Sequence, residues 1–310
     1  MGKKCSKCGE TAVYLRRYTN ERLCVSCLVK TTQERVRKTI NRLDLLRDDD
    51  RIVVAISGGK DSAVLLDVLT RIEKSFPRSE IVPLTIDEGI KGYRNRALEA
   101  ARGLVDSLGL ELIVRTFSDY FGMSLDEMIA KREPGSPSAC SYCGVFRRRA
   151  LNEAAKELEG DVLATGHILD DEAQTIVMNV LRGDTKRMAR TNTPRVDTIE
   201  GFVPRIKPLS QLSERDIVAY AHFLELPYHD VPCPYASEAY RNDIREFLNQ
   251  MEYKRPGTLL AILYSGETIA DALREDTTSG TTGVCERCGE PTTGRICKVC
   301  GMLRNLRGER

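Results

Sequence analysis

The apolar residues of this chain fall into short continuous runs separated by amphipathic stretches. Four runs have the length of buried strands, namely RIVVAI (51–56), EIVPLTI (80–86), LELIVRTF (110–117) and VLAT (162–165). Helical spacing follows the first run, where the residues on one face are Val64, Leu65, Val68, Leu69 and Ile72, and it recurs at 93–108. Strands that are apolar throughout and alternate with helices predict an α/β fold, with a parallel sheet covered on both faces.

Further helices are predicted at 31–46, from about Asp170 to Leu181, at 213–225 and at 237–250. The first of these opens with TTQE (31–34), which has the pattern of a capping box. The stretch EDTTSGTTG (275–283) is polar and contains glycine, as linkers do. These signals divide the chain into an N-terminal module (1–28), a core with a helical C-terminal part (29–274), and a linker with a C-terminal module (275–310).

Spacing separates the eleven cysteines into two quartets and a trio. The quartets are Cys5, Cys8, Cys24 and Cys27, then Cys285, Cys288, Cys297 and Cys300. Two CxxC pairs complete the four-thiolate shell of a structural zinc ion, so each quartet predicts one zinc site. The terminal modules are too small to fold without such a metal.

The composition limits the classes of protein to which this chain can belong. At 310 residues with 41% hydrophobic side chains, the chain can bury one large α/β core. No apolar run approaches the roughly 18 residues of a membrane span, and the start, MGKKCSKCGE, lacks the apolar stretch of a signal peptide. We therefore expect a cytoplasmic protein without membrane contact, in which reduced cysteines bind metals. The net charge of +2 neither requires nor excludes a nucleic-acid partner.

A candidate phosphate loop follows the first predicted strand. It reads Ser57-Gly58-Gly59-Lys60-Asp61-Ser62 and opens a helix. Glycines let backbone N–H groups approach an anion, and a helix N-terminus favours its negative charge. The loop lacks the GxxxxGK[ST] pattern, and a lone SGG would be an ordinary turn. This composition at the end of a buried strand predicts a nucleotide site, which we expect to include Ala55 and Asp87.

A second polar segment, TGHILDDE (165–172), follows the fourth predicted strand. Ligands collect at the carboxyl ends of parallel strands, so this segment is predicted to share an edge with the loop. Gly166 and His167 would contact the nucleotide, and Asp170 and Asp171 would hold Mg²⁺ or act as a base. The alternatives are helix capping for Asp171 and core packing for His167.

The remaining cysteines are Cys140 and Cys143 in CSYC and Cys233 in VPCPY. Three thiolates leave one position open, which suits a [4Fe-4S] cluster whose fourth iron can bind a sulfide. A sulfur relay, in which one cysteine carries a persulfide and another resolves it, is the alternative. The third interpretation is that Cys233 is merely a buried residue.

SGGKDS after an apolar strand resembles the signature of the pyrophosphate-loop ATPases, which have a Rossmann-like sheet and cleave ATP between the α- and β-phosphates. The chain also contains terminal zinc modules, CxxC at 140–143, GHxxDD at 166–171 and a late Cys233, in a characteristic order. That order is similar to the tRNA 2-thiouridine synthetases, including the NcsA and TtuA groups. The resemblance implies an enzyme that adenylates O2 of a tRNA uridine with ATP and replaces that oxygen with sulfur. Its implied catalytic residues are Lys60, Asp61, Arg147 and Asp170.

Four stretches are more similar to the branch that acts on the wobble uridine than to the T-loop branch: CSYCGVFRRRAL (140–151), MNVLRGDTKR (178–187), VAYAHFLELPY (218–228) and CPYASEAYRNDIREF (233–247). A lysine often follows the CxxC by four residues in T-loop enzymes, and Arg147 stands there in this chain. A guanidinium keeps the charge but cannot donate its proton near neutrality. The resemblance also implies a homodimer, with free sulfide or a thiocarboxylated ubiquitin-like carrier as the sulfur donor.

Other functions fit parts of the pattern. The same loop would serve T-loop uridine thiolation, an amidotransferase-type ligase or a 2-thiocytidine synthetase. A non-catalytic zinc-finger RNA-binding adaptor is a different class, against which the intact loop and cysteine trio argue. Residues that would bind RNA phosphates include Arg147, Arg148, Arg149, Arg182, Lys186, Arg187 and Arg190. For any single one of these basic residues, a position on a solvated helix face is a sufficient explanation.

Overall fold

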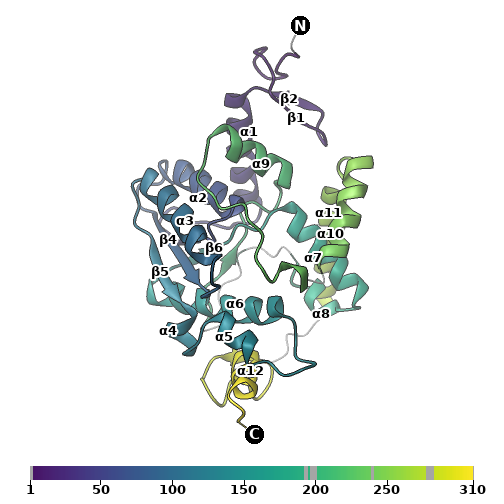
Figure 1. Cartoon of the computed structure of the whole chain (residues 1–310). Coiled ribbons are helices and arrows are strands. Elements are labelled where there is room, and N and C mark those ends of the chain that lie inside the picture. The colour runs from purple at the N-terminus through teal and green to yellow at the C-terminus, as the bar shows by residue number, and fades with distance from the viewer. Residues whose placement is uncertain (1–2, 192–194, 196–200, 239–240, 277–282, 310) are drawn as a thin grey trace.

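The computed structural model describes residues 3–191, 195, 201–238, 241–276 and 283–309. A five-stranded sheet in the order β5-β4-β3-β6-β7 lies at its centre, and all its strand pairs are parallel (Figure 1). Its strands are β3 (Arg51–Ala55), β4 (Glu80–Asp87), β5 (Ile113–Thr116), β6 (Val162–Ala164) and β7 (Arg205–Ile206). The predicted parallel α/β sheet is confirmed, with a Rossmann-like strand order that reverses between β3 and β6.

Alternating side chains of β3 separate two helical layers, because successive residues of a strand point to opposite faces. Ile52 and Val54 belong to the core of the first layer, and Val53 belongs to that of the second. The first layer contains α1 (Val25–Arg42), α2 (Lys60–Glu73), α3 (Arg94–Ser107) and α9 (Glu214–Phe223). The second contains α4 (Phe117–Phe121), α5 (Leu125–Ala130), α6 (Ala139–Glu157) and α12 (Lys298–Leu306). Burial on both faces explains why the strand is apolar throughout.

A separate helical group packs beside this sandwich, around α7 (Figure 1). It consists of α7 (Leu169–Leu181), α8 (Thr185–Met188), α10 (Arg241–Lys254) and α11 (Thr258–Asp276). A 3₁₀ turn, Ala236–Glu238, precedes α10. Among the described helices, none combines the length and apolar character that a bilayer span requires.

The terminal modules lie at opposite ends of the molecule (Figure 1). Each contains a two-stranded antiparallel hairpin, β1 (Tyr14–Arg16) with β2 (Glu21–Leu23) and β8 (Gly283–Val284) with β9 (Pro291–Thr292). The N-terminal hairpin packs on α9, and α12 of the C-terminal module packs on α6. Both modules are therefore attached to the core through helices.

Two expectations about local structure change. The predicted capping box at 31–34 is wrong, because α1 already begins at Val25, directly after Cys24 of the zinc module. Thr31 lies inside the helix and its hydroxyl donates to the carbonyl oxygen of Cys27 at 2.7 Å. The predicted linker starts too early, since α11 continues to Asp276, and residues 277–282 lie outside the described residues.

A buried ion pair joins the N-terminal module to the core. The Arg16 and Asp216 side chains are both 0% exposed, and Arg16 Nε donates to Asp216 Oδ1 at 2.8 Å. The other carboxylate oxygen accepts from the Tyr18 hydroxyl at 2.7 Å and the Ser213 hydroxyl at 2.9 Å. Asp216 is in the first turn of α9, so the pair fixes the hairpin against the start of that helix.

Replacing Asp216 with alanine should destabilise the protein by roughly 3–5 kcal/mol, because it leaves the Arg16 charge buried without its partner. The matched control is Asp48→Ala, since Asp48 and its partner Arg78 are 59% and 66% exposed. Removing an exposed pair should cost about 1 kcal/mol or less. Denaturant unfolding of the zinc-loaded proteins measures both changes, and equal losses would contradict the anchoring role.

Candidate functional site

The candidate phosphate loop connects β3 to α2, which begins at Lys60. Gly58 has φ +86°, and a Cβ at this position would lie 2.2 Å from the carbonyl oxygen of Ala97 in α3. The loop is closed by Ser62, whose hydroxyl accepts from Ser57 N at 3.1 Å and donates to the carbonyl oxygen of Gly59 at 2.9 Å. A tight glycine loop before a helix N-terminus provides the backbone donors that a phosphate group requires.

The second polar segment packs directly on this loop. A Cβ on Gly166, which follows β6, would lie 3.0 Å from Ser62 N and 3.1 Å from the carbonyl carbon of Asp61. The two segments therefore meet at the carboxyl edge of the sheet, as expected for neighbouring parallel strands. This meeting point lies where the strand order reverses, between β3 and β6.

Five charged side chains gather around the start of α2. Lys60 Nζ lies 3.0 Å from Glu214 Oε1 and 3.5 Å from Asp61 Oδ1. Asp170 Oδ2 accepts from the backbone N–H of Glu214 at 2.8 Å. Asp171 caps α7 by accepting from Ile168 N at 3.1 Å, which agrees with the capping alternative for this residue. Lys60, Asp61 and Asp170 are thus brought together.

Burial raises the pKa of Asp61 to about 6; Asp171 and Glu214 add to the shift, and Lys60 opposes it. Burial also raises the pKa of Asp170 to about 6; the Glu214 backbone N–H opposes this, and the charges of Glu214 and Asp171 add to it. A bound cation favours the ionised form of carboxyl groups that resist ionisation. Carboxylate oxygens are ligands that Mg²⁺ prefers, so Asp61 and Asp170 are residues here that could hold it.

Two predicted nucleotide contacts have internal partners. His167 Nδ1 lies 2.9 Å from the Thr165 hydroxyl, and burial, reinforced by the charge of Lys207, lowers the pKa of His167 to about 4. His167 is therefore neutral near pH 7. Asp87, at the end of β4, accepts from Gly89 N at 2.8 Å and lines a hollow of about 900 Å³. That hollow opens beside the same sheet edge.

The cysteine trio lies near the N-terminus of α6. Cys140 and Cys143 occupy the first turns of α6, and the Cys140 thiol donates to the carbonyl oxygen of Tyr235 at 3.3 Å. Burial raises the pKa of Cys143 to about 11, Arg147 opposes the shift, and the charges of Cys233 and Cys140 add to it. Because Tyr235 contacts Cys140 and lies two residues after Cys233, the Cys233 segment lies beside the first turn of α6.

The trio and the quartets differ in spacing. Within each quartet all four sulfur atoms lie within 4.8 Å of one another, with Cys8 and Cys24 3.5 Å apart and Cys288 and Cys297 3.7 Å apart. Sulfur atoms about 3.8 Å apart are what tetrahedral zinc at 2.3 Å requires. In the described part of the chain, the trio forms no such compact group. A cluster of several irons is larger than one ion, so its ligands need not converge as closely.

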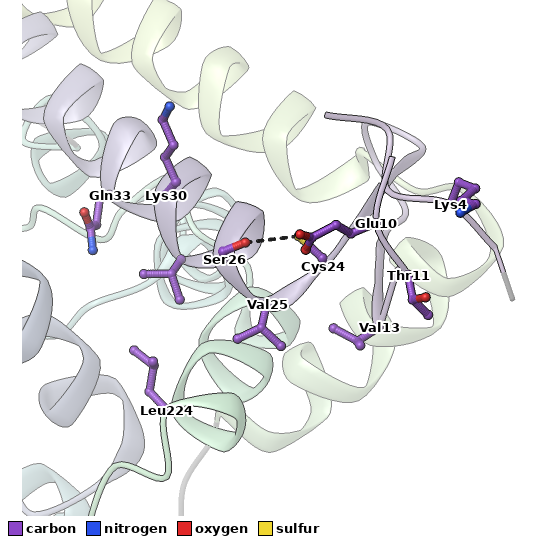
Figure 2. Close-up of a pocket in the computed structure, with 11 residues that line it drawn as sticks. Lys4, Glu10, Thr11, Val13, Cys24, Val25, Ser26, Lys30, Gln33 and Leu224 are labelled. Atoms are coloured by element: carbon purple, nitrogen blue, oxygen red, sulfur yellow. Dashed lines mark hydrogen bonds between the residues drawn. The ribbon is translucent and has the colours of Figure 1, made fainter. Parts of the chain in front are cut away.

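A hollow of about 940 Å³ lies beside the N-terminal quartet, and the Ser26 hydroxyl is hydrogen-bonded to the Cys24 thiol at 3.3 Å. Figure 2 shows the residues that line this hollow. Val25, Lys30 and Leu224 line it, whereas the phosphate loop does not. This hollow is consequently separate from the candidate site.

Sequence reasoning missed three site residues. Glu214 reaches Lys60, Arg241 Nη1 lies 3.0 Å from Asp171 Oδ1, and Glu88 pairs with Arg147 at 2.7 Å. Glu214 follows Ser213, the N-cap of α9, so in the sequence it reads as an ordinary first-turn acid. Glu88 adjoins the predicted Asp87, and this proximity was the one available signal.

The chain was compared with known proteins. The family described as "PP-loop domain" matches residues 28–252, and "2-thiouridine synthetase TtuA, N-terminal LIM domain" matches residues 4–29. The tRNA 2-thiolation protein NcsA of Haloferax volcanii is 38% identical, over 98% of this chain and 99% of its own. Cytoplasmic tRNA 2-thiolation protein 1 of Drosophila willistoni is 39% identical, over 97% of this chain and 87% of its own.

A solved structure is similar over nearly the whole chain. It is the U34-tRNA thiolase NcsA from Methanococcus maripaludis with its [4Fe-4S] cluster, at a TM-score of 0.84 and 35% identity. The alignment covers 98% of this chain and 96% of that chain.

Gly58→Ala should destabilise the protein by about 1–3 kcal/mol or more, because alanine is strained at positive φ and its Cβ would clash with Ala97. Gly59→Ala is the matched control, since its φ is −89° and its Cβ would meet only the Ser57 hydroxyl, at 3.5 Å. Denaturant unfolding of both variants measures the difference. A Gly59 variant as unstable as the Gly58 variant would refute the steric explanation.

Asp170→Asn should stabilise the protein at pH 8 in the absence of added Mg²⁺. The folded-state pKa of about 6 exceeds the unfolded value, so ionisation above pH 6 costs stability that is fully recovered below about pH 4. The gain from asparagine should grow across that window to at most about 3 kcal/mol. Asp49→Asn, at an exposed position, is the control. A gain independent of pH would contradict the assignment.

Proposed function

Because this chain belongs to the family of PP-loop tRNA 2-thiolation proteins, we propose that it uses ATP to convert the wobble uridine of tRNA to 2-thiouridine. One observation carries the proposal. The phosphate loop and the three leftover cysteines approach the same sheet edge, in a chain similar along 98% of its length to a U34-tRNA thiolase with a [4Fe-4S] cluster. The names of the relatives favour the wobble position over the T loop, and tRNA thiolation over an adaptor role.

The first half-reaction activates the uridine. O2 of the base attacks the α-phosphorus of ATP, and pyrophosphate leaves. We assign the loop 57–62 to the departing pyrophosphate, whose charge its backbone N–H groups and Lys60 would stabilise. Asp61 and Asp170 would hold Mg²⁺, which neutralises phosphate charge when bound. Gly166 packs directly against this loop.

The second half-reaction replaces oxygen with sulfur. A sulfur nucleophile attacks C2 of the activated uridine, and AMP leaves with the former O2. Cys140, Cys143 and Cys233 would hold a [4Fe-4S] cluster, which supplies an iron position for an incoming sulfide. Arg147, whose pKa Glu88 raises, remains cationic beside Cys143 and would stabilise the developing negative charge. The sulfur would come from free sulfide or a thiocarboxylated ubiquitin-like carrier.

The rest of the chain would support this core. We assign one zinc ion to each quartet, with a scaffolding role for the modules at 1–28 and 275–310 around the core at 29–274. Arg148 and Arg187 would bind tRNA phosphates: the charge of Arg187, which also pairs with Asp184 at 3.2 Å, adds to the burial that lowers the pKa of Arg148, and a phosphate beside both cations would relieve that repulsion. Action in the cytoplasm, like that of the fly relative, and a homodimeric state complete the proposal.

The proposal is tested by nucleoside mass spectrometry of tRNA treated with anaerobically reconstituted protein, ATP and sulfide. Cys233→Ala should lose iron–sulfur absorbance and all 2-thiouridine, while ATP binding stays within about twofold, because the loop contains no cysteine. Cys288→Ser is the matched control: it should lower the zinc content and leave the iron signal intact.

Each opposite result is informative. Full thiolation by iron-free protein would decide for a persulfide relay. A product found in the T loop would refute the wobble assignment, and release of AMP and pyrophosphate by Lys60→Ala at the wild-type rate would refute the loop's role.

A further inference from the structure

Charged side chains form a continuous path between the phosphate loop and the cysteine trio. Glu88, directly after β4, and Arg94, the first residue of α3, are each 4% exposed, whereas Arg147 at the cysteine end is 43% exposed. Neither Glu88 nor Arg94 contacts a reacting group in the half-reactions described above. Their contacts extend in opposite directions, towards Ser57 and towards Cys143.

On the loop side, α3 fixes the first residues of the phosphate loop. Arg94 Nη1 donates to the carbonyl oxygen of Ser57 at 2.5 Å, and Nη2 donates to the Thr85 hydroxyl in β4. One turn later, Ala97 presses against Gly58, where a Cβ would lie only 2.2 Å away. A shift of the loop on phosphate binding must therefore be accompanied by Arg94 or break these contacts.

On the cysteine side, Glu88 uses both carboxylate oxygens. Oε2 lies 3.1 Å from Arg94 Nε as an ion pair without hydrogen-bond alignment, and Oε1 accepts from Arg147 Nε at 2.7 Å. Arg147 Nη2 then donates to Cys143 Sγ at 3.1 Å. One buried carboxylate thus determines where two planar guanidinium groups lie.

A charged path is an unusual choice for stability alone. Apolar residues of similar volume often stabilise a core as well as a buried ion pair does. The charged groups also fix directions. The guanidinium groups of Arg94 and Arg147 are both oriented by the Glu88 carboxylate, and each contacts a functional element. The path is thus suited to transmit a change at the loop to Cys143.

We propose that Glu88 and Arg94 are positioning residues that couple the phosphate loop to Cys143, so that nucleotide at the loop changes the reactivity of this thiol. The identity of the ligand as ATP rests on the proposed function. Activation of the uridine and readiness of the sulfur site would thereby be synchronised.

The test measures alkylation of Cys143 by iodoacetamide in the full-length, zinc-loaded, iron-free chain, resolved by tandem mass spectrometry. The probe is an ATP analogue with a methylene group between the α- and β-phosphates. In the wild type, saturating analogue should change the Cys143 rate by about fivefold or more, a typical coupling. In Glu88→Gln and Arg94→Lys the change should fall below about twofold, while the analogue still binds.

Asp50→Asn is the matched control, because Asp50 forms a similarly buried pair with Arg195 at the opposite end of β3. The two side chains are 3% and 7% exposed, and the shorter contact is 2.6 Å. This variant should keep the full nucleotide effect. Arg94→Lys keeps the charge but cannot span both partners, so it tests the path if Glu88→Gln does not fold.

The outcomes separate the two proposals. A wild type that binds the analogue without a change at Cys143 overturns the coupling, and so do variants that keep the full effect. Failure of the wild type to bind the analogue at all would refute the proposed function instead. If Asp50→Asn also loses the nucleotide-dependent change in Cys143 alkylation, general destabilisation explains the result. That outcome would overturn the assignment of the coupling to this path.

Discussion

The site depends on close backbone packing at the point where the strand order reverses. A Cβ on Gly58 would lie 2.2 Å from the carbonyl oxygen of Ala97 in α3, which excludes a side chain there, and a Cβ on Gly166 would lie in tight contact, 3.0 Å from Ser62 N at the start of α2. These contacts bring the carboxyl ends of β3 and β6 together around one loop. Because the loop is fixed from both sides, its backbone N–H groups are preorganised for a phosphate, and little ordering entropy remains to be lost on binding.

Unfavourable charge is concentrated at the same edge. Asp170 is buried and Asp61 is half-buried beside other carboxylates, and the pKa of each is raised to about 6. Around them, Lys60 pairs with Glu214, Arg241 pairs with Asp171, and Lys207 pairs with Glu172. Asp170 accepts a hydrogen bond from Glu214 N, and Asp61 has only the long contact of 3.5 Å with Lys60. A locally unfavourable arrangement of charges in an otherwise consistent fold is characteristic of a binding site for a charged ligand.

The terminal modules attach to opposite ends of this architecture, and Tyr14, Arg17 and Tyr18 of the N-terminal one line a hollow together with Asp170 and Glu214. The N-terminal one leads directly into α1 and is fixed to α9 by the Arg16–Asp216 pair. The first turn of α9 also carries Glu214, which contacts Lys60. The N-terminal module therefore borders the helix end that completes the charged group at the loop. At the other end, α12 packs on α6, the helix that carries two of the trio cysteines.

Sequence alone determined the features that depend on local spacing. The apolar run at 51–56 predicted β3, because a strand buried on both faces must be apolar throughout. The CxxC pairs predicted both four-thiol groups, because ligands for one ion must be close in the chain or brought together by a short hairpin. The loop 57–62 was recognised because glycine and helix-start signals are also local. The capping box at 31–34 was wrong because the metal module imposes an earlier start on α1.

Tertiary structure decided everything that joins distant segments. Neither α6 nor α11 was predicted, since cysteines and arginines interrupt the apolar pattern of α6, and α11 had no recognised start. Glu214 meets Lys60, and Arg241 meets Asp171, only because helices late in the chain return to the sheet edge. Glu88 and Arg147 are 59 residues apart in sequence, yet they form one path with Cys143. Spacing could count the three unmatched cysteines, but only the packing of α6 against the loop at 233–235 brings them together, because long-range contacts are fixed by topology and not by local pattern.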